Sequence, residues 1–318
     1  MRILVAGGAG FIGSHAVTHF SNCGDDVYVL DALTYAGDVN RIKESIDLGT
    51  KFFKLDIRDR HAVERCLSDI RPEYLVNFAA ETHVDRSIVD AKDFITTNFE
   101  GACNLMNLCR EYSTFYVHMS TDEVYGAALP YASRGFIESD KLDPKNPYAA
   151  SKAAADHMLE ANRNTYGQPY LAFRPSNNYG PRQNEEKFLP KLIKCLIAKP
   201  GTLNFPLYGI GDQIREWTYV KDTARAIRAS IVEQKRGLRQ GGFVNVSSNV
   251  SMTNVDLISH VKHTLSEMGC LNNPDCITSV QDRKGHDRCY WIESSVKCQF
   301  TPFDVALRET IASFALAE

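Results

Sequence analysis

The sequence predicts an α/β protein built on a doubly wound parallel sheet, with a smaller C-terminal lobe that binds substrate. Apolar strand-like segments alternate with helical segments through the first half of the 318-residue chain, which favours a parallel sheet. A glycine-rich turn directly follows the first apolar segment. Beyond about residue 176 the elements become shorter. We therefore expect one domain over 1–175 and a lobe over 176–318, with some return of the lobe to the first domain.

Composition and charge argue against several classes of protein. A formal net charge of −3 provides no basic surface for nucleic acid. No apolar run approaches 18 residues and no leader-like segment precedes the first strand, so we expect no membrane span and a cytoplasmic location. The nine cysteines are scattered without a Cys-x-x-Cys pair. This spacing is typical of reduced thiols and favours neither a disulfide framework nor a metal site.

The glycine-rich turn has the spacing of a dinucleotide-binding loop. Gly7 permits the tight turn, Gly10 lets the backbone approach a pyrophosphate, and Gly13 lets the following helix pack closely against the strand. Phe11 and Ile12 then begin a helix whose N-terminus faces the phosphates. Taken alone, the motif is equally compatible with an ordinary glycine-rich turn.

An acidic residue at the end of the second strand strengthens the dinucleotide interpretation. The segment 26–31 is strand-like and ends in Asp31, 18 residues after Gly13. A carboxylate at this spacing hydrogen-bonds a ribose diol and repels a 2′-phosphate, so the sequence favours NAD over NADP in a Rossmann-like domain. The other residues expected at the cofactor are Asp56 and Ile57 after a third strand, Ala79 and Ala80 after a fourth, and Thr97 in a long helix over about 90–112.

The most informative stretch follows the apolar run 115–119. This run suits a buried parallel strand, and Thr121, Asp122 and Glu123 come directly after it. They are therefore expected at the carboxyl end of the sheet, where open α/β sheets bind ligands. A solvated strand end is the ordinary alternative for such a polar run.

A second pair of candidate catalytic residues lies in the next helix. Pro147 suits the first turn of a helix, and Tyr148 and Lys152 then share one helix face. A lysine ammonium beside a phenol lowers the pKa of the phenol, which would make Tyr148 a usable base near neutral pH. The Tyr-x-x-x-Lys spacing also occurs by chance on many helices.

The second half of the chain contains fewer signals. Residues 174–182 are expected to interrupt regular structure, either as amides for sugar hydroxyls or as an ordinary turn. A hairpin-like turn is expected over 208–217, and helices over about 221–234, 253–268 and 303–316. The basic residues available for a diphosphate, unless they are solvated surface charge, are Lys187, Arg215, Arg283, His286 and Arg288.

Together these motifs resemble the extended short-chain dehydrogenase/reductase superfamily over essentially the whole chain. Within it, the sequence is most similar to nucleotide-sugar 4,6-dehydratases, particularly the dTDP-glucose 4,6-dehydratases. The segments that carry the resemblance are 31–37, 120–126, 176–181, 211–215 and 282–288. The sequence departs from the family pattern at Lys284, over 244–249 and in the segment after Lys297, which puts base or sugar preference in question more than the chemistry.

The resemblance implies a role for each candidate residue. Tyr148, supported by Lys152 and Thr121, would remove the proton of the sugar C4 hydroxyl while C4 is oxidised by NAD. Glu123 would then take the C5 proton and Asp122 would protonate the departing C6 hydroxyl. The residues that the resemblance places at the nucleotide sugar are His83, Ser87, Thr121, Asn177, Lys187, Arg215, Asn249, Arg283 and His286. A homodimer built on the helices near 91–112 and 147–166 is implied in the same way.

Two other functions remain open at this point. A UDP-sugar 4-epimerase or decarboxylase of the same superfamily needs only a ketone at C4, and the acids at 122 and 123 count against it. A non-catalytic NAD-binding scaffold has no need of Tyr148, Lys152 and the acid pair together. The nucleotide base, dTDP or UDP, is not fixed by the sequence.

Overall fold

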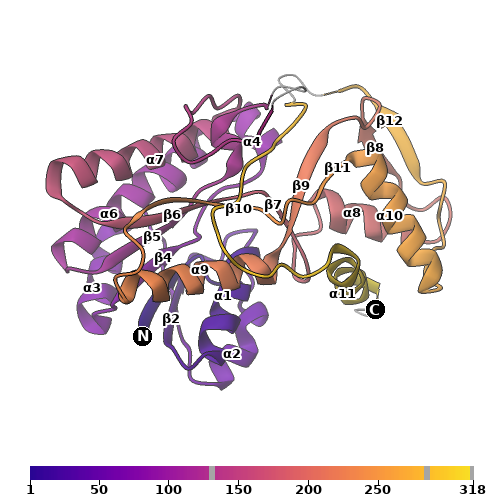
Figure 1. Cartoon of the computed structure of the whole chain (residues 1–318). Helices are drawn as coiled ribbons and strands as arrows, with labels where there is room; N and C mark the ends of the chain where they lie inside the picture. The colour runs from indigo at the N-terminus through magenta and orange to yellow at the C-terminus, as the bar shows by residue number, and fades with distance from the viewer. Residues whose placement is uncertain (129–132, 283–286, 316–318) are drawn as a thin grey trace.

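A computed structural model of the chain describes residues 1–128, 133–282 and 287–315. Its larger part is a seven-stranded sheet in which all neighbouring strands are parallel (Figure 1). In spatial order the strands are β10 (Gly242–Val246), β6 (Tyr170–Pro175), β5 (Phe115–Met119), β4 (Tyr74–Asn77), β1 (Arg2–Ala6), β2 (Asp26–Asp31) and β3 (Lys51–Lys54). The predicted doubly wound sheet is confirmed, with its reversal of strand order between β1 and β4.

Helices cover both faces of this sheet. Successive apolar side chains of a strand point to opposite faces, so the strands contribute to two separate cores. Ile3 and Val5 of β1 contribute to one core, and Leu4 and Ala6 contribute to the other. The first core is closed by α1 (Phe11–Asn22) and α9 (Val220–Lys235), and the second by α3 (Arg60–Ile70), α6 (Ala102–Glu111) and α7 (Pro147–Tyr166). Both α9 and β10 come from the C-terminal half of the sequence.

The long helix expected over about 90–112 is confirmed from Lys92 to Glu111, after a separate short helix α4 (Val84–Val89). It consists of α5 (Lys92–Phe94), η2 (Ile95–Gly101) and α6, and η2 has the wider π-helical hydrogen bonding. Gly101 closes this wider turn, and a Cβ there would lie 2.7 Å from the side chain of Ile57. Such π-helical turns are frequent at functional sites, and the predicted cofactor residue Thr97 lies in this one.

The C-terminal lobe contains two small sheets (Figure 1). One pairs β8 (Phe205–Tyr208) with β12 (Ile277–Val280), and the other places β9 (Ile214–Tyr219) between β7 (Asn177–Tyr179) and β11 (Ser251–Thr253). The helices α8 (Phe188–Ile197), α10 (Asn254–Glu267) and α11 (Phe303–Ala315) enclose a third apolar core around Trp217. The helices expected over about 221–234, 253–268 and 303–316 correspond to α9, α10 and α11, and each is confirmed to within two residues at either end.

Two sequence expectations for this lobe were only partly right. Over 208–217 the chain turns and enters β9, as expected, but β8 and β9 belong to different sheets and do not form a hairpin. Residues 174–182 are not wholly irregular, because 177–179 form β7, which pairs in parallel with β9. The strands that pair with β7, β8 and β9 are not their neighbours in the sequence, so local turn chemistry could not indicate the pairing. Among the residues that the structure describes, no helix is both long enough and apolar enough to cross a lipid bilayer.

Candidate active site

The carboxyl end of β5 opens into a cavity of about 770 Å³ between the large sheet and the C-terminal lobe. The chain leaves β5 at Met119 and enters the short helix η3 (Asp122–Tyr125), with Thr121 as its N-cap. The hydroxyl of Thr121 accepts a hydrogen bond from the Glu123 backbone N–H at 3.3 Å. The five predicted catalytic residues, which all line this one cavity, are Thr121, Asp122, Glu123, Tyr148 and Lys152.

The N-terminus of α7 fixes how Tyr148 and Lys152 enter the cavity. Pro147 lies in the first turn, as predicted, and the Asn146 side chain caps the helix by accepting a hydrogen bond from the Ala149 N–H at 2.8 Å. The amide group of Asn146 also donates to Glu123 Oε2 at 3.1 Å. Asn146 was missed as a site residue, although an asparagine before a helix-starting proline is a readable N-cap signal.

The environment of Tyr148 differs from the sequence expectation. Lys152 is buried, and its ammonium donates to the backbone carbonyl of Met119 at 2.6 Å. Burial, followed by the charge of Glu123, raises the pKa of Tyr148, and a hydrogen bond with Thr121 opposes this rise. Burial lowers the pKa of Lys152 to about 8, against the influence of Asp156. The predicted lowering of the Tyr148 pKa by Lys152 is therefore not what this structure shows.

The two acids of η3 have different electrostatic surroundings. Burial, then the charges of Glu123 and Glu216, raises the pKa of Asp122 well above its ordinary value. Its Oδ2 has no hydrogen-bond partner among the described residues. Burial also raises the pKa of Glu123, but Asn146 and Arg215 oppose that rise. The arrangement therefore favours a protonated Asp122 beside a more readily ionised Glu123.

The glycine loop leaves the space that a bound pyrophosphate needs. A Cβ on Gly7 would lie 2.4 Å from the Ala79 nitrogen, and one on Gly13 would lie 2.2 Å from the Gly7 oxygen. No side chain caps the N-terminus of α1, whose N-cap is Gly10. Backbone and helix can thus approach a phosphate without side-chain obstruction, so these residues fit a dinucleotide.

A smaller cavity of about 300 Å³ adjoins this loop at the carboxyl ends of β2, β3 and β4. The Asp31 carboxylate lies here and accepts hydrogen bonds from the N–H groups of Ala9 at 3.0 Å and Leu33 at 2.8 Å. The predicted cofactor residues that line this cavity are Gly7, Gly10, Asp31, Asp56, Ile57, Ala79, Ala80 and Thr97. Phe11, Ile12 and Gly13 line the larger cavity, which shares Gly10 and Ala80 with the smaller one.

The predicted substrate residues are only partly brought together. His83, Asn177, Lys187 and Arg215 line the larger cavity with Thr121. Ser87 is buried and donates to the Val84 carbonyl at 2.6 Å, so it does not reach the cavity. Asn249 likewise is not part of the cavity wall. Arg283 and His286 lie outside the described residues.

Arg215 is held in place at the cavity wall by backbone carbonyl groups. It donates to Ile214 and Asp287 at 2.8 Å, and its guanidinium lies 4.4 Å from the centre of the Tyr290 ring. Asp287 and Tyr290 also line the cavity, and neither was predicted from the sequence. Within the described ranges, no group of three or more His, Cys, Asp or Glu side chains is placed to hold a metal ion.

A dinucleotide cradle that opens into a cavity with titratable residues defines an NAD(P)-dependent enzyme of the Rossmann type. Residues 3–247 match the NAD dependent epimerase/dehydratase family. The chain belongs to this family, so its cofactor is NAD, as Asp31 predicted.

Individual relatives resemble the chain over nearly its whole length. A probable dTDP-glucose 4,6-dehydratase of Sinorhizobium fredii is 39% identical, covering 98% of this chain and 92% of its own. The crystal structure of DesIV, a dTDP-glucose 4,6-dehydratase from Streptomyces venezuelae with NAD and TYD bound, is 35% identical with a TM-score of 0.89, covering 100% and 98% of the two chains. A UDP-glucose 4-epimerase of Thermus thermophilus in complex with NAD is 28% identical with a TM-score of 0.87, covering all of both chains.

Gly13→Ala should weaken retention of NAD about tenfold or more, the effect of roughly 1.4 kcal/mol. The new methyl group would meet the Gly7 oxygen and push α1 away from the loop. The measurement is the NAD content of the purified protein after extensive dialysis. Gly24→Ala is the control, because it strains a backbone of φ +75° but points into open space. Equal NAD content in all three proteins would contradict the assignment of the cradle.

Proposed function

We propose that this protein is an NAD-dependent hydro-lyase that converts a nucleotide-diphosphate glucose, dTDP-glucose, to the 4-keto-6-deoxy sugar. One observation carries the proposal: the carboxyl pair Asp122 and Glu123 faces the same cavity as Tyr148 and Lys152. Oxidation at C4 needs only a base beside the cofactor, whereas removal of water across C5 and C6 needs a base and an acid in addition. The relatives that are 4,6-dehydratases support the same reading.

The residues can divide the reaction between them. When bound, NAD supplies an acceptor for the C4 hydride and later returns that hydride to C6. Ionised Tyr148, a form that the positive charge of bound NAD would favour against burial, takes the proton of the C4 hydroxyl. Thr121, hydrogen-bonded to Tyr148, holds the same oxygen. The ketone at C4 makes the C5 proton acidic, and Glu123 removes it. Asp122 gives its proton to the C6 hydroxyl, which leaves as water, and Glu123 returns a proton to C5 when C6 takes the hydride.

The rest of the cavity suits a charged nucleotide sugar. Lys187 and Arg215 bring positive charge to the cavity wall and would bind the diphosphate. His83 and Asn177 line the same cavity and would contact the sugar end. We also propose that the protein is a cytoplasmic homodimer that pairs the 91–112 and 147–166 helical segments. In this proposal 1–175 forms the cofactor domain, to which α9 and β10 return from the later part of the chain. Light scattering tests the dimer by its mass.

A UDP-sugar 4-epimerase is the nearest alternative, because such enzymes share the fold. Epimerisation gives a product of unchanged mass, so the acid pair would have no chemical role in it. The test is incubation of the protein with dTDP-glucose, UDP-glucose and other nucleotide-glucoses, followed by mass spectrometry. Loss of one water, fastest with dTDP-glucose, is expected. Product of unchanged mass would reject the dehydratase, and no product from any of them would leave a non-catalytic scaffold.

The two pairs of catalytic residues should be separable by mutation. Tyr148→Phe should abolish both reduction of bound NAD and product formation, because the first proton transfer is lost. Glu123→Gln should still reduce NAD but should lower water loss about 10²–10⁴-fold, the usual contribution of a general base. Nicotinamide absorbance and entry of solvent deuterium at C5 measure the two steps. Near-normal water loss in Glu123→Gln would show that the acid pair is structural.

Arg215→Ala should raise KM for the nucleotide sugar about 10- to 100-fold. A charge-assisted hydrogen bond to an ionised group is worth about 1.5–3 kcal/mol, and this cation is fixed at the cavity wall. Arg239→Ala is the control, because Arg239 pairs with Glu233 away from the cavity. Steady-state kinetics of both variants give KM and kcat. An unchanged KM in Arg215→Ala would contradict the placement of the diphosphate.

A further inference from the structure

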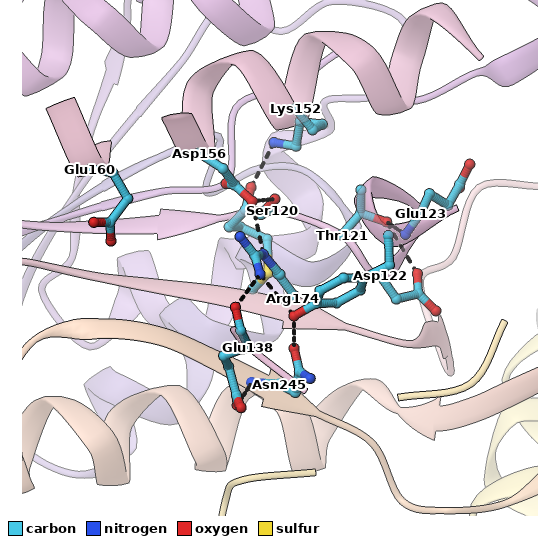
Figure 2. A network of polar contacts seen from close by, with 12 residues as sticks. Ser120, Thr121, Asp122, Glu123, Glu138, Lys152, Asp156, Glu160, Arg174 and Asn245 are labelled. Carbon is cyan, nitrogen blue, oxygen red and sulfur yellow. Dashed lines mark hydrogen bonds and ion pairs between the residues drawn. The ribbon is translucent and has the colours of Figure 1, made fainter. Parts of the chain in front are cut away.

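A buried ion pair lies directly behind the catalytic residues, and the proposed chemistry gives it no role. Arg174 Nε and Asp156 Oδ2 are 2.9 Å apart, and their side chains are 2% and 0% exposed. Asp156 lies one helical turn after Lys152 on the same face of α7, and Arg174 lies on β6 (Figure 2). A charge pair this deep in the protein is costly to desolvate, so its hydrogen bonds to the surroundings decide what it does.

The segment 120–125, which contains Asp122 and Glu123 and is called the acid segment below, is joined to this pair at its start through Ser120. The hydroxyl of Ser120 donates to Asp156 Oδ2 at 3.0 Å (Figure 2). Its backbone N–H donates to the Phe173 carbonyl at 2.7 Å. Ser120 immediately precedes Thr121. The point at which the chain leaves β5 is thus fixed to α7, the helix that carries Tyr148 and Lys152.

The other end of the segment is tied to the same pair through Tyr125. Arg174 Nη1 donates to the Tyr125 hydroxyl at 2.8 Å, and that hydroxyl donates to Asn245 Oδ1 of β10 at 2.8 Å. The Tyr125 ring also stacks on Phe136, with centroids 5.1 Å apart. Tyr125 is the last residue of η3 and is 1% exposed.

The guanidinium of Arg174 is itself held on several sides. Its Nη1 donates to the Glu138 carbonyl at 3.2 Å, and its carbon lies 3.7 Å from the centre of the Phe243 ring. Glu138 Oε1 in turn accepts from the Asn245 N–H at 2.7 Å (Figure 2). These contacts fix Arg174 against β10. Through Ser120 and Tyr125, they also restrict the two ends of the acid segment.

We propose that the Asp156–Arg174 pair, acting through Ser120 and Tyr125, is a positioning unit that holds Asp122 and Glu123 in line with Tyr148 and Lys152. The pair touches neither substrate nor cofactor. It fixes the distance between the residues for C4 oxidation on α7 and the residues for water loss on η3. This inference rests on the proposed 4,6-dehydratase function and adds four positioning residues to it, Ser120, Tyr125, Asp156 and Arg174.

The test is Tyr125→Phe, which removes the one hydroxyl that joins η3 both to Arg174 and to Asn245. Water loss should slow about 10- to 100-fold, the range that misplacement by up to about 1 Å can cost. The rate of NAD reduction in a single turnover and KM should stay at the wild-type values, because α7 and the cations of the cavity are untouched. Ser120→Ala removes the hydrogen bond to Asp156 at the other end of the acid segment. It should likewise slow water loss without slowing NAD reduction.

Tyr116→Phe is the matched control. Tyr116 is also fully buried, and its hydroxyl contacts Asn77 and His118, each at 3.1 Å, away from η3. Its rates should equal those of the wild type. The proposal is overturned if Tyr125→Phe and Ser120→Ala leave water loss unchanged, if they slow NAD reduction and water loss equally, or if Tyr116→Phe gives the same separation. Wild-type protein that makes no dehydrated product would instead reject the proposed function, and the positioning role with it.

Discussion

Two neighbouring carboxyl groups that share one largely desolvated cavity cannot both carry full charge at neutral pH without strong repulsion. Asp122 and Glu123 are in this situation, and burial is the largest influence on the pKa of each. Arg215 favours the ionised form of both groups. Asn146 and Lys187 further favour that of Glu123, whereas the charges of Glu123 and Glu216 disfavour that of Asp122. An acid and a base therefore arise from two adjacent residues.

The remainder of the fold places this pair where it can act. The carboxyl ends of parallel strands meet at one edge of the sheet, so β5 delivers the acids beside the dinucleotide loop that follows β1. The C-terminal lobe forms the other side of the cavity and contributes Lys187 and Arg215 to its wall. The buried Arg174–Asp156 pair lies beneath, and loss of one partner of such a pair costs about 3–5 kcal/mol. Rigid supports of this kind suit a site that must run two proton transfers in order.

The sequence predicted those features that depend on neighbouring residues. The glycine loop, the start of α7 at Pro147 and the polar end of β5 all have local signals, and the structure contains each of them. The family resemblance extended this to the cations of the second lobe. Ser87 was misjudged because a motif gives no orientation, and its hydroxyl contacts its own helix.

Features that depend on distant parts of the chain could not be predicted. The pairing of β9 with β7 and β11 joins segments that no turn connects. Arg174 and Asp156 lie on different elements, and nothing in either local sequence indicates that they meet. The raised pKa of Tyr148 has the same origin, because its burial and its distance from Glu123 are set by tertiary packing. Local pattern thus identified most of the chemical groups, and tertiary structure determined their protonation.

The most direct test of this account is the protonation state of Asp122 at neutral pH. The difference infrared spectrum between the wild-type protein and Asp122→Asn measures it, since a protonated carboxyl group and a carboxylate absorb in separate regions. Loss of a protonated-carboxyl band on substitution is the predicted result, because burial and the two neighbouring acids hold the Asp122 pKa well above its ordinary value. Loss of carboxylate bands alone would show that Asp122 is ionised, and would contradict its role as the acid that releases water.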